Sequence, residues 1–306
     1  MGTCGGVGRA TPPGPIAGSG VEGNKDGPFA TAQFSDPQGM ALDGDTLYVA
    51  DRKNHQIRAL DLKAQTVKVA AGIGEQDRTG RFRGGPALRT GLNSPWDLLM
   101  HNGKLFIAMA GHHQIWTYDP ANARVAPFAG NGREELADGG LEESSFAQPS
   151  GLASDGKHLY VADSEISAIR SAPFDPAGEV KTIVGEGLFE FGDTDGIGSK
   201  VRLQHALGVA HRNGKLYVAD TYNSKIKLID PGKRSCETFL GEPGGWLEGR
   251  TFDEPGGLSF AGDKLYVADT NAHRIRVIDM NTQAVTTLRL EGVEPPPAAK
   301  NKATTK

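Results

Sequence analysis

A short apolar run recurs five times along the chain. The string LYVAD occupies residues 47–51, 159–163, 216–220 and 265–269, and LFIAM at 105–109 is a variant copy. Runs rich in Val, Ile and Tyr that are bounded by turn residues favour β-strands. Copies separated by about 50 to 60 residues suit a repeat unit of several strands.

Three further landmarks keep a constant offset from the last residue of each run. Fourteen residues earlier lie Pro37, Pro95, Pro149, Ala206 and Pro255. Three residues before those lie Phe34, Leu92, Phe146, Leu203 and Phe252, and six residues after the run lie Ile57, Ile115, Ile169, Ile226 and Ile275. Agreement at four landmarks in five copies establishes a true internal repeat.

Each repeat predicts four strands. In the first repeat they cover residues 37–43, 47–51, 57–62 and 67–72: a glycine-containing segment, the LYVAD run, an alternating segment and a segment that ends in glycine. Asn and Gly in the first connection tolerate positive φ, as a hairpin turn requires. Such a sheet is apolar on both faces and is covered only by neighbouring sheets around an axis. We therefore predict an all-β fold, a propeller with five complete four-stranded blades.

The composition argues against some classes of binding partner and indicates a cellular compartment. The chain has 42 Gly and 18 Pro, a net charge of −4 and no basic patch, so nucleic acid and anionic membranes are not expected partners. Cys4 and Cys236 form no CxxC pair, which favours a reducing compartment. No secretory signal and no run of 18 apolar residues is present, so we expect a cytoplasmic location. Residues 1–13 and 292–306 are expected to be disordered, leaving a propeller over 14–291.

The residues around the repeat landmarks resemble a known family. Asn54-His55-Gln56-Ile57 follows the NHL repeat pattern, and the segments SPWDLL, IAMAGHHQIW, FAQPSGL, FGDTDGIG and LYVADTNAHRIRVID are similar to the propeller of the thioredoxin-plus-NHL family. The resemblance covers roughly residues 15–290 and implies a six-bladed ring between a thioredoxin-like domain and a small β domain. This chain has neither domain, so the family's redox association does not transfer directly.

Against that family pattern, the chain holds five whole repeats. Residues 14–20, GPIAGSG, resemble the last strand of a preceding blade, which makes them a remnant of a sixth. We therefore expect a fragment that either closes as five blades or remains an open arc with two exposed apolar faces. Closure as five blades would favour a monomer.

Residues repeated in every blade are expected to be structural. The aspartates that end the LYVAD runs, Asp51, Asp163, Asp220 and Asp269, are interpreted as acceptors of backbone N–H bonds in the following turn. His55, His113 and His273 share one repeat position and would be spread around the ring, which argues against zinc. FGDTDGIG at 191–198 lacks the third acidic ligand and the terminal Glu of an EF-hand, so calcium is not expected.

The second repeat departs from the pattern. Met109 replaces the aspartate, and Trp96 and Trp116 stand where other repeats have small or polar residues. Two interpretations stay open: drift with compensating packing, or a partner surface that includes His113.

Polar residues precede the first strand of every repeat and are expected to surround one mouth of the central channel. They are Asp36, Ser94, Gln148, His205 and Glu254. A wet channel mouth accounts for this polarity, and a binding site at the mouth is the other interpretation. Asp36, His205 and Glu254 would form a divalent-metal site, as in lactonase-type propellers, only if they converge.

The sequence contains no catalytic motif of the GxSxG, HExxH, P-loop or Rossmann kinds. We therefore predict a non-catalytic scaffold without a cofactor, which binds a protein or a small ligand within a thioredoxin-linked system. A metal-dependent hydrolase or lyase at the channel mouth is the alternative. The candidate binding residues are Asp36, Ser94, Trp96, Met109, His113, Trp116, Gln148, His205 and Glu254.

Overall fold

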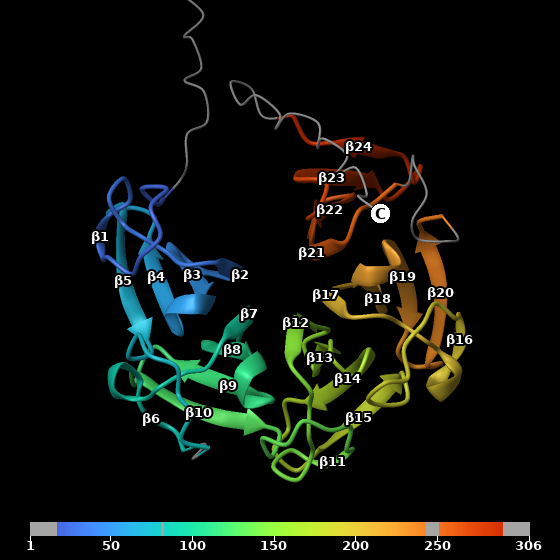
Figure 1. Cartoon of the computed structure of the whole chain (residues 1–306), viewed down its shortest axis with the longest axis horizontal. Helices are drawn as coiled ribbons and strands as arrows, with labels where there is room; N and C mark the ends of the chain where they lie inside the picture. The colour runs from blue at the N-terminus through green and yellow to red at the C-terminus, as the bar shows by residue number, and fades with distance from the viewer. Residues whose placement is uncertain (1–16, 81–82, 243–250, 290–306) are drawn as a thin grey trace, which may run out of the picture.

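Five antiparallel sheets radiate from a common centre in the computed structural model, which describes residues 17–80, 83–242 and 251–289 (Figure 1). We number these sheets blades 1 to 5 in chain order. Within each blade the chain runs from the innermost strand outward, as the repeat predicts. In the described part of the chain no helix is long and apolar enough to span a bilayer.

Equivalent strands occupy equivalent places in the five blades. The innermost strands are β2 (Pro37–Asp43), β7 (Pro95–His101), β12 (Pro149–Ser154), β17 (Ala206–Arg212) and β21 (Pro255–Ala261). The second strands, which contain the LYVAD runs, are β3 (Thr46–Asp51), β8 (Lys104–Met109), β13 (His158–Asp163), β18 (Lys215–Asp220) and β22 (Lys264–Asp269). The third strands are β4 (Gln56–Asp61), β9 (Gln114–Asp119), β14 (Ala168–Pro173), β19 (Lys225–Asp230) and β23 (Arg274–Asp279). The fourth strands are β5 (Thr66–Ala71), β10 (Arg124–Ala129), β15 (Glu179–Val184), β20 (Ser235–Leu240) and β24 (Val285–Thr287).

Short elements complete the blades. Two-residue strands pair with the outer edge of blades 1 to 4: β1 (Gly27–Pro28), β6 (Gly85–Pro86), β11 (Gly139–Gly140) and β16 (Gly196–Ile197). The repeat did not predict these strands, because two residues carry no alternation. Single 3-10 turns are η1 (Arg52–Asn54), η2 (Ala87–Arg89), η3 (Ala110–His112), η4 (Gly198–Lys200) and η5 (Thr221–Asn223).

The core is divided among the seams between blades. One cluster joins Tyr48 and Ile57 of blade 1 to Leu98 and Trp116 of blade 2, and similar clusters fill the later seams. Each inner strand packs on the next, from β2 through β7, β12 and β17 to β21. Each blade is thus stabilised mainly by burial against its neighbours.

The ring does not close between blade 5 and blade 1. Figure 1 shows a gap between these two blades, and no comparable packing joins β2 to β21 in the described part of the chain. Ile275 on blade 5 is 39% exposed, although its four equivalents are 0% exposed. Met40 on blade 1 is 60% exposed, whereas its equivalents Leu98 and Leu152 are buried. Of the two expected arrangements, the structure is the open arc.

The expected remnant of a sixth blade lies partly outside the described residues. Residues 17–20 form no strand, but the N–H of Gly18 donates to the Phe29 carbonyl at 2.8 Å. Gly72 and Gly130, which follow the fourth strands of blades 1 and 2, make the same bond to Ala87 and Leu141. The expected terminal segments 1–13 and 292–306 lie outside the described residues.

Candidate binding face at the channel mouth

In four of the blades, the repeated aspartate makes a hydrogen bond within its own blade. One carboxylate oxygen of Asp51, Asp163, Asp220 and Asp269 accepts the N–H of a residue 16 positions earlier, at 2.5–2.7 Å. The donor lies in the segment that leads into the innermost strand. The predicted structural role is right, but the predicted partner, the turn after the aspartate, is wrong. The turn geometry is local, whereas the bond observed connects segments far apart in sequence.

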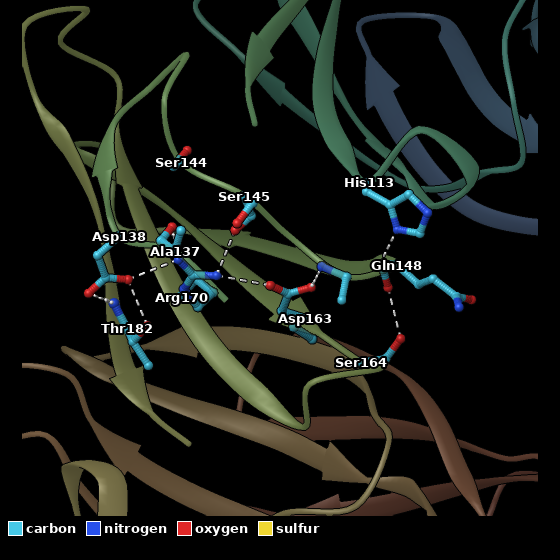
Figure 2. A network of polar contacts seen from close by, with 12 residues as sticks. His113, Ala137, Asp138, Ser144, Ser145, Gln148, Asp163, Ser164, Arg170 and Thr182 are labelled. Atoms are coloured by element: carbon cyan, nitrogen blue, oxygen red, sulfur yellow. Dashed lines mark hydrogen bonds and ion pairs between the residues drawn. The ribbon is translucent and has the colours of Figure 1, made fainter. Parts of the chain in front are cut away.

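In blade 3 the repeated aspartate also pairs with a buried cation. Figure 2 shows Arg170, which is fully buried, between Asp163 at 3.1 Å and Asp138 at 2.9 Å. Burial raises the pKa of the Asp163 carboxyl, against the lowering effect of Arg170. Arg170 also donates to the carbonyl groups of Ser145 and Ala137. A buried ion pair is tolerated only with this degree of pairing.

The same three-residue arrangement recurs in blade 1, and blade 4 has a related one. In blade 1, Arg58 lies between Asp51 at 2.8 Å and Asp26 at 2.6 Å. In blade 4, Lys227 takes the place of the arginine and lies 2.8 Å from Asp195.

The loop that resembles a calcium site is part of this arrangement. The carboxylates of Asp193 and Asp195 are bonded to the ammonium groups of Lys225 and Lys227. Asp195 also accepts bonds from the backbone and hydroxyl of Thr238. Lysine ammonium groups thus lie against both carboxylates of this loop.

Blade 2 replaces the whole ionic arrangement with apolar packing. Met109 and Trp116 occupy the positions of the aspartate and the arginine, and Gly84 occupies that of the outer aspartate. Met109 and Trp116 are 0% exposed, and the Trp116 indole N–H donates to Gln114 at 2.9 Å. Neither side chain can contact a partner in this structure. The compensating-packing interpretation is therefore the correct one for Met109 and Trp116.

The five residues expected at the channel mouth share an unusual backbone conformation. Asp36, Ser94, Gln148, His205 and Glu254 all lie in the left-handed region, with φ between 48° and 55°, immediately before an innermost strand. Because each immediately precedes the first residue of an innermost strand, the five lie at the same end of the channel, as expected. We call this end of the propeller the mouth face.

Backbone hydrogen bonds join this ring to the preceding blades. The N–H of Ser94 donates to Nδ1 of His55 at 3.0 Å, and that of Gln148 donates to Nδ1 of His113 at 3.3 Å. At the next two seams a serine hydroxyl accepts the bond, from His205 to Ser167 at 3.1 Å and from Glu254 to Ser224 at 3.4 Å. We call these four bonds the seam hydrogen bonds. Two of the three repeated histidines, His55 and His113, thus act as hydrogen-bond acceptors between blades.

The side chains of the ring pair locally and do not converge. The Asp36 carboxylate binds the guanidinium of Arg52, which lies 4.9 Å from the centre of the Trp96 indole ring. His205 Nε2 lies 3.3 Å from a carboxylate oxygen of Glu165. Among the residues that the structure describes, no group of three or more His, Cys, Asp or Glu side chains could hold a metal ion. The condition for the metal-dependent alternative, convergence of Asp36, His205 and Glu254, is not met.

The central channel contains one carboxylate that the sequence reasoning missed. Asp97 on β7 occupies a position that is glycine in the other blades. Its carboxylate accepts the N–H groups of Leu98 and Leu152, both at 2.8 Å, and so joins blades 2 and 3. Burial raises the pKa of Asp97 to about 6, against the lowering effect of the two N–H bonds. The break in the glycine pattern was the signal that pointed to this residue.

A cavity of about 720 Å³ lies beside Asp97 in the channel. Inner-strand residues of all five blades line it, and it extends to Tyr266 and Ile275 on the uncovered face of blade 5. Its walls are mostly apolar and glycine-rich. The cavity therefore continues into the open side of the arc.

Comparison with known proteins agrees with this geometry. The family model of the NHL repeat matches residues 34–60 and 252–278. Protein SUPPRESSOR OF QUENCHING 1, chloroplastic, from Arabidopsis thaliana is 42% identical over 314 residues, which cover 94% of this chain and 29% of that protein. NHL repeat-containing protein 2 from Homo sapiens is 39% identical over 273 residues, which cover 77% of this chain and 37% of that protein. The chain thus spans about a third of the length of these relatives.

Solved structures show the same fold at low sequence identity. A chain of the nidogen/laminin complex has a TM-score of 0.61 at 12% identity, covering 84% of this chain and 81% of the other. Streptogramin B lyase has a TM-score of 0.54 at 12% identity, covering 84% and 70%. Together with the five repeated blades and the matched repeats, these findings show that the chain is an NHL-repeat β-propeller, homologous to part of NHL repeat-containing protein 2 and of SUPPRESSOR OF QUENCHING 1.

Proposed function

We propose that the chain is a non-catalytic scaffold that binds a protein partner through its mouth face. The observation that carries this proposal is that repeated and variable polar residues lie in different places. Those at repeated positions are engaged within or between blades, as Asp163, Arg170 and His113 are. The polar residues that precede the innermost strands differ from blade to blade and lie at the mouth face, where loops on a rigid frame are available for recognition.

The chemistry at the mouth face favours binding over catalysis. A general acid or base needs a titratable group within reach of a bound substrate, and a metal site needs several converging ligands. Two of the ionisable side chains there, Asp36 and His205, are already bound to nearby partners, Arg52 and Glu165. These contacts favour the scaffold over the hydrolase or lyase alternative.

If the chain works in a thioredoxin-linked system, we propose that its partner supplies the redox-active thiols. The cysteine in the described part of the chain, Cys236, is buried, and burial raises the pKa of its thiol to about 12. A thiol in that state is a poor nucleophile, because the thiolate is the reactive species. Any disulfide chemistry in such a system would therefore be carried out by the partner and not by Cys236.

Site-specific photo-crosslinking tests the proposal. A benzoylphenylalanine at Lys53, in the turn after β3 on the mouth face, is expected to capture a protein in extracts of cells that express the chain. The same group at Lys104, where β8 begins at the opposite end of the blade, is the matched control. Both lysines are exposed. Equal capture at both positions, or capture at Lys104 alone, would overturn the assignment of the mouth face.

A further inference from the structure

The first part of the loop between blades 3 and 4 is two residues longer than the same part of the loops before blade 1 and between blades 1 and 2. Two backbone bonds mark the start and end of such a loop: a glycine after the fourth strand, and a later N–H that donates to the carbonyl of the Phe or Leu landmark. These positions are Gly18 and Gly23 before blade 1, and Gly72 and Asp77 between blades 1 and 2, five residues apart in both cases. Between blades 3 and 4 they are Gly185 and Gly192, seven residues apart.

The longer loop presents aromatic side chains to solvent. Phe189 is 85% exposed and Phe191 is 54% exposed, whereas Leu188 between blades 3 and 4 packs against the buried Ala147 and Ile166. Phe189 has a φ of 69°, a conformation that is costly for a bulky residue. An anchored loop that holds exposed aromatic residues at such a cost is a feature that folding alone does not require.

Contacts place this loop at the edge of the mouth face. The amide of Asn223 donates to the Gly192 carbonyl at 2.6 Å, which brings the loop beside the turn that carries Tyr222. Tyr222 is 47% exposed and stacks on His205, with ring centres 4.4 Å apart. We call Phe189, Phe191 and Tyr222 the aromatic patch.

Three glutamates lie beside residues of the aromatic patch. Glu186 and Glu190 flank Phe189 and share one cation, Arg202. Glu165 lies beside Tyr222 through its contact with His205. Aromatic faces attract cations through their quadrupole, and nearby carboxylates add to this attraction.

We propose that an arginine- or lysine-rich segment of a protein partner docks on the aromatic patch. This proposal rests on the proposed function, and it specifies where on the mouth face the partner binds and what kind of side chains it presents. Basic side chains would stack on Phe189, Phe191 and Tyr222 and pair with Glu165 and the Glu186–Glu190 carboxylates. An anionic membrane or a nucleic acid would face repulsion from the same carboxylates.

Fluorescence anisotropy with two labelled probes tests this proposal on the full chain. One probe is a heptapeptide of alternating glycine and arginine, and the other has glutamate in place of arginine. We expect the arginine peptide to bind at least tenfold more tightly, with an affinity that falls as salt rises. The combination of Phe189→Asn and Phe191→Ala is expected to weaken binding about tenfold; Asn tolerates the left-handed backbone at position 189.

Leu88→Ala provides the matched control, because Leu88 is 60% exposed and lies on a different blade. It should leave peptide affinity unchanged, and circular dichroism should show that all variants keep the fold. Equal affinity for the two peptides, or unchanged binding in the double variant, would overturn the proposal. Concentration-dependent dimerisation that the double variant abolishes would assign the patch to a second copy of the chain instead. If the peptides do not bind but crosslinking at Lys53 succeeds, only this surface assignment fails and the proposed function stands.

Discussion

At the scale of single residues, the buried arginines of blades 1 and 3 each lie between two carboxylates. Arg170 is wholly buried, and its guanidinium contacts two carboxylates and two carbonyl groups. Met109 and Trp116 show that one blade dispenses with the charges altogether. The intermediate state, one charge without its partner, should be the unstable one.

Arg170→Met is therefore expected to destabilise the chain by about 3–5 kcal/mol, because it leaves the Asp163 carboxylate buried without its cation. Adding Asp163→Met should recover part of that loss, because blade 2 has methionine, Met109, at the equivalent position. Urea denaturation of the wild type, the two single variants and the double variant measures the coupling between the two positions. Strictly additive losses would show that the pair does not act as a unit.

Cys236 is expected to be unreactive while the chain is folded, because burial disfavours the thiolate. In a chain that carries Cys4→Ser, a disulfide reagent such as Ellman's should label no thiol in native buffer at pH 8 and one thiol in 6 M guanidinium. Rapid labelling of the native chain would mean that the seam around Cys236 opens readily.

Local patterns predicted some of these residue roles and missed others. The repetition of Asp51 and its equivalents was enough to predict a structural role. Their buried cations were not predicted, because a spacing of seven residues across a turn carries no recognised signature. Asp97, Phe189 and Phe191 were also missed, since each is visible only as a departure from the repeat once equivalent positions are aligned.

At the scale of elements, the seam hydrogen bonds are of two chemical kinds. His55 and His113 accept them at the first two seams, and Ser167 and Ser224 accept them at the last two. A histidine can accept through Nδ1 only when that nitrogen is unprotonated. Burial lowers the pKa of both histidines, for His113 against the raising effect of Glu134 and Glu165.

The first two seams should therefore weaken in acid. Because the folded-state pKa lies below the unfolded value of about 6.5, the stabilisation is complete above that value and is lost as the pH falls below it. Relative to a variant with His55→Ser and His113→Ser, which copies the last two seams, the wild type should therefore lose urea midpoint between pH 7.5 and pH 5.5. Asp97 and Asp163, whose pKa values are raised by burial, and His112, whose pKa is lowered by burial, are present in both proteins, so their contributions cancel in this comparison. An unchanged pH dependence in the serine variant would contradict the role of the two histidines.

At the scale of the whole molecule, the open arc leaves two blade faces without neighbours. The innermost-strand residue Met40 and the third-strand residue Ile275 mark these faces, on blades 1 and 5. The sequence predicted the blades and their order, because each blade is a local unit. It did not predict whether blade 5 meets blade 1. That depends on the sum of the angles between neighbouring blades, which no single repeat specifies.

Equivalent isoleucines should consequently differ in their contribution to stability. Ile226→Ala is expected to cost about 2–5 kcal/mol, as for a fully buried side chain. Ile275→Ala at the equivalent position should cost less than about 1 kcal/mol, because Ile275 is 39% exposed. Denaturation midpoints of the two variants make the comparison. Equal losses would indicate that a neighbour covers blade 5 in solution.

Hydrogen exchange of the full chain, followed by mass spectrometry, tests most directly whether each blade is stabilised by the neighbours on its two faces. The account predicts slow exchange in β9, β14 and β19, which lie in blades with a neighbour on both sides. It predicts distinctly faster exchange in β23 and β2, at the two ends of the arc. The account would be contradicted if β23 were as protected as β9, β14 and β19, and β2 as protected as the innermost strands β7, β12 and β17, because blades would then be equally stable whether or not both faces are covered.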